Sequence, residues 1–75
     1  MTSTDFLAKF RDLFEDTDPE SIDLATDYKD LNEWSSLISF SLIAMVKTEY
    51  DKSVTGAEIR HCNTVEDLYK TIVSK

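Results

Sequence analysis

Residues that form turns and crosslinks are scarce in this chain. Its 75 residues include one glycine, one proline and one cysteine. A single cysteine excludes an internal disulfide and, with no apolar signal-peptide segment, indicates the reducing cytoplasm. One glycine excludes a glycine-rich phosphate loop and argues against hairpin-rich β architecture, because both need residues that tolerate positive φ. The sequence therefore predicts an all-α fold, and its length predicts a single domain over residues 1–75.

Long hydrophobic runs and an excess of positive charge are also missing. No segment approaches the length of a membrane span, and the net charge is -7. Nucleic acids and anionic membranes both require a basic surface, so we expect neither as a partner. Residues 15–33 hold eight acidic residues against one lysine, which accounts for the whole negative excess. This segment is either a solvated loop or a surface that steers basic partners.

The first helix and the segment after it have different patterns. Apolar residues recur at helical spacing over residues 6–14. We therefore expect a helix that is capped by Ser3 or Thr4 and ends near Asp16. No period holds over residues 17–33, where isolated apolar side chains interrupt the acidic residues. This pattern predicts a long ordered loop.

Three further helices follow from capping signals and apolar spacing. The second helix begins at Ser35 or Ser36, both good N-cap residues, and runs to about Tyr50. "TGAE" at residues 55–58 matches a capping box and predicts a short third helix. The last helix is capped within "NT" at residues 63–64. Three longer helices, one short helix and a long first connecting loop predict a small four-helix bundle.

The second helix is apolar on two sides. A rotation of about 100° per residue places a broad apolar sector where it can face the core. Three residues fall outside that sector and form what we call the narrow strip: Leu37, Phe40 and Ala44. Either a neighbouring helix covers the narrow strip, or it is exposed and binds a partner. In both cases Ser36 lies at the helix N-terminus, where free N–H groups and the helix dipole favour an anion.

These features together resemble the acyl carrier protein family. "SSL" at residues 35–37 stands where that family has Asp-Ser-Leu, at the start of the second of four helices. "DYKDL" at residues 27–31 looks like the family's Phe-x-Asp-Leu, and "NTVEDLYKTI" at residues 63–72 is similar to its final helix, which opens with Thr-Val. The tripeptide alone has no weight. The register of the elements carries the resemblance, which covers nearly the whole chain.

The resemblance implies a carrier and not an enzyme. Ser36 would carry 4'-phosphopantetheine, donated from coenzyme A by a magnesium-dependent phosphopantetheinyl transferase. The thiol of this arm would hold an acyl or aminoacyl group as a thioester and present it to acyl-loading and acyl-transfer enzymes of fatty acid, polyketide or specialised biosynthesis. The narrow strip would seat these enzymes, with Asp30 and Glu33 guiding basic surfaces. We expect a monomeric, stand-alone, cytoplasmic carrier.

Two departures from the family pattern point to a specialised member with dedicated partners. Ser35 replaces the motif aspartate, and Ser41 and Lys47 stand where the family commonly has acidic residues. Ser35 is an alternative modification site, but the position of Leu37 favours Ser36. The missing aspartate also motivates an alternative function, an unmodified acidic interaction module with a carrier-like fold that binds a protein through the narrow strip.

Other patterns are weaker. The acidic residues of 16–27 partly match a calcium loop, but a serine replaces the required glycine and the final glutamate is missing. His61 and Cys62 are too few for a structural zinc site, and no nucleophile elbow supports a catalytic Ser36. We therefore expect no metal site and no catalytic residue. Three aromatic residues either seal the core, which we favour, or line a ligand pocket: Tyr28, Trp34 and Tyr69.

Overall fold

The computed structural model describes residues 1–75 and contains four α-helices and no strand. This confirms the all-α fold with three longer helices, one short helix and a long first connection. The helices are α1 Ser3–Arg11, α2 Ser36–Tyr50, α3 Gly56–His61 and α4 Val65–Val73. Two short 3₁₀ helices lie within the first connection: η1 Pro19–Ser21 and η2 Tyr28–Asp30.

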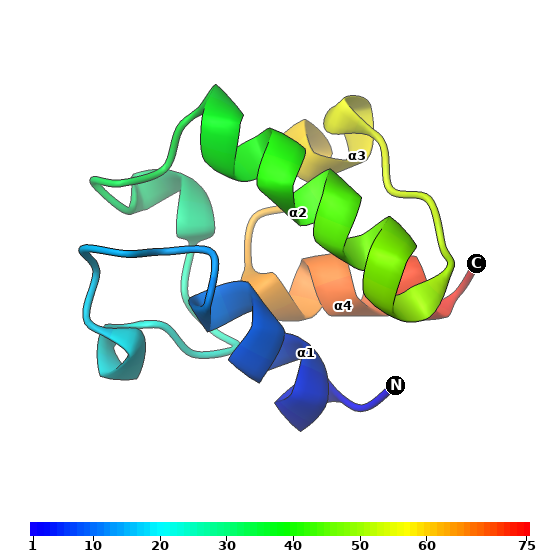
Figure 1. Ribbon diagram of the computed structural model, residues 1–75, viewed down its shortest axis with the longest axis horizontal. Coiled ribbons are helices and arrows are strands. Elements are labelled where there is room, and N and C mark those ends of the chain that lie inside the picture. The colour runs from blue at the N-terminus through cyan, green and yellow to red at the C-terminus, as the bar shows by residue number, and fades with distance from the viewer.

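The four helices surround one core (Figure 1). α1 contacts α4, and α3 contacts both α2 and α4. The two chain termini lie on one side of the molecule, and the long connection lies on the opposite side (Figure 1). This connection leads from the end of α1 to the first residue of α2, so it determines where α2 begins. None of the helices combines the length and apolar character needed to cross a membrane.

α1 is shorter than its apolar pattern predicts, and its cap is a different residue. The hydroxyl of Thr2, not that of Ser3 or Thr4, caps the helix by accepting a hydrogen bond from the amide of Asp5 at 3.1 Å. The helix ends at Arg11 instead of near Asp16. The amides of Leu13 and Phe14 donate to the carbonyls three residues earlier, so the chain leaves the α-helix there, and the amides of residues 15–16 donate to the carboxylate of Glu33. The prediction was wrong because the apolar spacing continues through Phe14, beyond the last residue with α-helical hydrogen bonding.

The other helices begin where local capping residues place them. Ser35 caps α2, so the helix itself starts at Ser36. Thr55 and Glu58 form the predicted capping box of α3, and Thr64 forms a second box at the start of α4. α2 ends at Tyr50, and its C-cap Asp51 has a φ of 54°, in the left-handed region that breaks a helix.

The core draws on every α-helix and on the long connection. Fourteen residues are buried, and none of them is charged. Phe6 and Phe10 of α1 are fully buried, with ring centroids 6.1 Å apart. Ile22 and Tyr28 of the connection are also fully buried. The connection is therefore an ordered part of the core, because burial of these side chains offsets the entropy lost in ordering a long loop.

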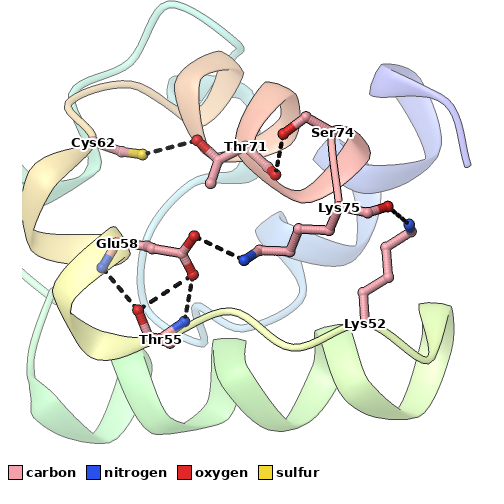
Figure 2. A network of polar contacts seen from close by, with 7 residues as sticks. All are labelled: Lys52, Thr55, Glu58, Cys62, Thr71, Ser74 and Lys75. Carbon is pink, nitrogen blue, oxygen red and sulfur yellow. Dashed lines mark hydrogen bonds and ion pairs between the residues drawn. The ribbon is translucent and has the colours of Figure 1, made fainter.

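α3 has only six residues and is held in place by side chains from elsewhere. The Nζ of Lys75 donates to a carboxylate oxygen of Glu58 in α3 at 2.8 Å, and the Nζ of Lys52 donates to the carbonyl of Lys75 at 2.8 Å (Figure 2). The Lys75 ammonium is the main reason that the pKa of Glu58 lies below its ordinary value. A helix this short is marginal alone, and the Glu58 contact ties it to Lys75, the residue that follows the end of α4.

Candidate functional site

Two adjacent serines at the start of α2 have different roles. Ser35 is the N-cap, and its hydroxyl accepts a hydrogen bond from the amide of Ile38 at 3.4 Å. Ser36 is the first helical residue; it is exposed, and its hydroxyl has no hydrogen-bond partner in the protein. The hydroxyl of Ser36 is therefore free to react, whereas that of Ser35 is engaged with the backbone.

The narrow strip lies open to solvent along α2 from Ser36. Leu37 is 72 % exposed and Phe40 is 68 % exposed. Ala44, one turn further along, is exposed as well. Neither α3 nor α4 covers these side chains, so of the two interpretations of the strip the exposed one is correct. Single exposed apolar residues are normal, but an aligned set beside a free hydroxyl is a candidate contact surface.

Asp30 and Glu33 lie in the long connection and differ in their contacts. The carboxylate of Glu33 accepts hydrogen bonds from the amides of Glu15 at 2.9 Å and Asp16 at 3.1 Å, and from the hydroxyl of Thr17 at 2.7 Å. The Thr17 hydroxyl, followed by these amides, holds the pKa of Glu33 below its ordinary value. Asp30 is exposed, and its side chain forms no ion pair or hydrogen bond. Asp30 is thus free for a partner, whereas Glu33 stabilises the loop.

A groove of about 240 Å³ opens between α2 and α3 beside Ser36. We call it the α2–α3 groove, and its walls combine apolar, hydroxyl and basic side chains. The residues that line it are Lys29, Trp34, Ser35, Ser36, Ser39, Phe40, Ile43, Gly56, Ile59 and Arg60. The sequence pattern pointed to neither Lys29 nor Arg60, because their proximity to Ser36 depends on the packing of α3.

Tyr28 connects the long connection to α3. Its ring is fully buried, and its hydroxyl lies within hydrogen-bonding distance of the carbonyl oxygens of Ile59 and, at 3.0 Å, Cys62. These carbonyls belong to the C-terminal end of α3, where backbone acceptors lack helical partners. Burial raises the pKa of Tyr28 above its ordinary value, so the hydroxyl remains a donor. Tyr28 positions α3, and with it one wall of the α2–α3 groove.

Trp34 and Tyr69, the other two aromatic residues that could have lined a ligand pocket, lie at the edge of the core. Trp34 packs edge-on against Tyr28 with ring centroids 4.8 Å apart, and it also lines the α2–α3 groove. Tyr69 is half-buried, and its ring centroid lies 6.1 Å from that of Phe6. Tyr28 and Tyr69 therefore seal the core, and only Trp34 of the three faces a groove.

No group of three or more histidine, cysteine, aspartate or glutamate side chains is arranged to hold a metal ion. His61 is exposed, while Cys62 is buried with its sulfur 3.4 Å from the hydroxyl of Thr71. No family model, curated protein or solved structure matches the chain. The function must therefore be inferred from Ser36 and its surroundings.

Proposed function

We propose that this protein is an acyl or aminoacyl carrier protein that tethers a thioester-bound intermediate on 4'-phosphopantetheine attached to Ser36. The observation that carries the proposal is the exposed, unpartnered hydroxyl of Ser36 on the first turn of α2. A transferase must bring that oxygen into its own active site, which a buried or hydrogen-bonded hydroxyl would hinder. The cap formed by Ser35 leaves Ser36 as the reactive member of the pair.

The position of Ser36 also suits the product of the modification. Attachment of the arm creates a phosphodiester, which carries a negative charge. The first backbone N–H groups of a helix have no helical acceptors, and the helix dipole places about half a positive elementary charge at that end. A phosphodiester on Ser36 is therefore stabilised by α2 itself.

The surroundings of Ser36 supply contact surfaces for the enzymes that a carrier must visit. We propose that a phosphopantetheinyl transferase and acyl-loading and acyl-transfer enzymes dock on the narrow strip, where Leu37 and Phe40 are mostly exposed. Asp30 adds an exposed charge nearby for basic partner surfaces. Contacts of this small size favour weak, short-lived complexes, which suit a monomeric cytoplasmic carrier that is not itself an enzyme.

Mass spectrometry tests the proposal. We expect the protein to gain one phosphopantetheine group after incubation with coenzyme A, Mg²⁺ and a broad-specificity transferase. The gain should be absent in Ser36→Ala and retained in Ser35→Ala, with circular dichroism confirming that both variants fold. No gain with several transferases, or a gain that survives Ser36→Ala, would overturn the proposal.

A second candidate function is an unmodified protein-interaction module, for which the exposure of Leu37 and Phe40 is the supporting observation. Serine at position 35 in place of the motif aspartate weakens recognition by a general transferase. For this function, a pulled-down partner should be retained by Ser36→Ala and lost in Phe40→Asp. A partner that binds only the phosphopantetheine-bearing protein would exclude this function in favour of the carrier.

A further inference from the structure

The α2–α3 groove differs in charge from the rest of the molecule. The chain has 15 acidic and 8 basic residues, yet the groove is lined by two basic residues, Lys29 and Arg60, and by no acidic one. A second groove, in the long connection, is lined by Asp16, Asp30 and Glu33 and by no basic residue. The charge of the groove lining is therefore opposite in sign to the net charge of the protein.

Arg60 is the basic residue whose side chain has no partner. Four lysines form ion pairs with carboxylates: Lys9, Lys47, Lys70 and Lys75. The remaining three basic side chains donate to backbone carbonyls: Arg11, Lys29 and Lys52. The guanidinium of Arg60 forms no ion pair with a carboxylate and donates no hydrogen bond to a carbonyl. In a protein with a large excess of carboxylates, a free guanidinium at a groove is available to an external anion.

The side chain of Arg60 extends along α3 toward the groove. A Cβ atom placed on Gly56 would lie 3.5 Å from Nη1 of Arg60, so the guanidinium lies over the first turn of α3. Side chains on a helix point back toward its N-terminus, which explains this direction. Gly56 and the exposed Arg60 both line the groove that Ser36 also lines, so the cation and the attachment residue border the same groove.

The groove combines this cation with apolar walls. Trp34, Phe40, Ile43 and Ile59 are its hydrophobic lining residues. A hydrocarbon chain would contact those four side chains but leave the guanidinium without a partner. A short acyl group that ends in a carboxylate would contact both, because guanidinium and carboxylate form paired, charge-assisted hydrogen bonds. A volume of about 240 Å³ lies below the ~300 Å³ typical of small-molecule pockets, which restricts the occupant to a short segment.

We infer that the α2–α3 groove selects a short acyl cargo with a free terminal carboxylate, the half-thioester of a dicarboxylic acid, and that Arg60 binds this carboxylate. The inference rests on the proposed carrier function, since the cargo reaches the groove only on a flexible arm attached to Ser36. The arm folds back over the groove, the methylene groups contact Phe40 and Ile59, and the carboxylate lies against the guanidinium. Arg60 is thus a specificity-determining residue.

A matched pair of cargoes tests the inference. A broad-specificity transferase loads Ser36 from glutaryl-coenzyme A or from pentanoyl-coenzyme A, which have the same number of acyl carbons and differ in the terminal carboxylate. We then measure cleavage of each thioester by hydroxylamine and the NMR shift of Arg60 Nε. The glutaryl thioester should be cleaved about two- to fivefold more slowly than the pentanoyl thioester, the range expected for one partly exposed ion pair.

Two variants separate Arg60 from general charge effects. Arg60→Gln should abolish the difference between the two thioesters, whereas Lys70→Gln, which removes an equal charge on α4 outside the groove, should preserve it. Equal cleavage rates, with the same Nε shift in the glutaryl and pentanoyl proteins, would mean that the guanidinium does not contact the carboxylate of the cargo. That result would overturn the cargo inference and leave the carrier function standing. Absence of any loaded species would instead overturn the carrier function together with the inference.

Discussion

The inner and outer sides of α2 are both apolar but differ in exposure. Ile38, Leu42 and Val46 on the inner side are 8 % exposed or less, whereas Leu37 and Phe40 on the outer side are 72 % and 68 % exposed. Hydrophobic stabilisation is roughly proportional to the apolar area removed from water. The inner side therefore holds the fold together, and the outer side is left for contacts with other molecules.

The largest expected effect comes from shortening a side chain on the inner side. Leu42 is fully buried, so Leu42→Ala should remove buried methyl groups and leave a cavity, which lowers the free energy of unfolding by about 2–5 kcal/mol. Urea unfolding followed by circular dichroism measures this change. An effect below this range would contradict the conclusion that the inner side of α2 stabilises the fold.

The next largest effect is expected for the buried hydroxyl of Tyr28, which positions α3 beside the core. Tyr28→Phe removes the hydroxyl that reaches the carbonyls of Ile59 and Cys62. The variant should lose about 1–3 kcal/mol of stability, since buried acceptors are left unsatisfied. Relative to the unaltered protein, the rate of hydrogen exchange should increase more for the amides of α3 than for those of α1. Unchanged exchange in α3 would contradict this positioning role.

A smaller effect on stability is expected from Glu33, where the connection leads into α2, and its pH dependence falls in the acidic range. The folded pKa of Glu33 lies below its ordinary value of 4.5 because the Thr17 hydroxyl and neighbouring amides bind the carboxylate. The carboxylate therefore contributes stability above pH 4.5, and this contribution is lost as the pH falls through the folded pKa. Unfolding midpoints should fall on acidification by less in Glu33→Gln than in the unaltered protein. An equal fall of the unfolding midpoint in both proteins would contradict a stabilising role of the Glu33 carboxylate.

The smallest effect on stability is expected on the outer side. Phe40→Ser should change the free energy of unfolding by no more than about 0.5 kcal/mol, because the side chain is mostly in water already. The same variant should bind the transferase more weakly, seen as a raised KM for the carrier in the modification assay. A loss of stability similar to that of Leu42→Ala would show that the narrow strip contributes to the fold.

Local features of the sequence predicted the elements well, and distant contacts caused the errors. The capping box of Thr55 and Glu58 was predictable, and the start of α2 could be narrowed to Ser35 or Ser36, because donor and acceptor lie within three or four residues. The contact between Glu33 and the amides of Glu15 and Asp16 was not predictable, because Glu33 lies 18 and 17 residues further along the chain. For the same reason, the role of the Tyr28 hydroxyl was hidden, since its acceptors lie 31 and 34 residues away.

By itself, the sequence determined the all-α class, the number of helices and the concentration of negative charge before α2. It also determined the cap of α3 and, to within one residue, the caps of α2 and α4. Each of these depends on composition or on short-range hydrogen bonds. Only the tertiary structure decided which apolar side of α2 is covered, that Glu33 is engaged within the loop, and that Arg60 faces a groove beside Ser36. These outcomes depend on how α3 and the connection pack against α2, and no pattern within a single segment encodes the position of its neighbours.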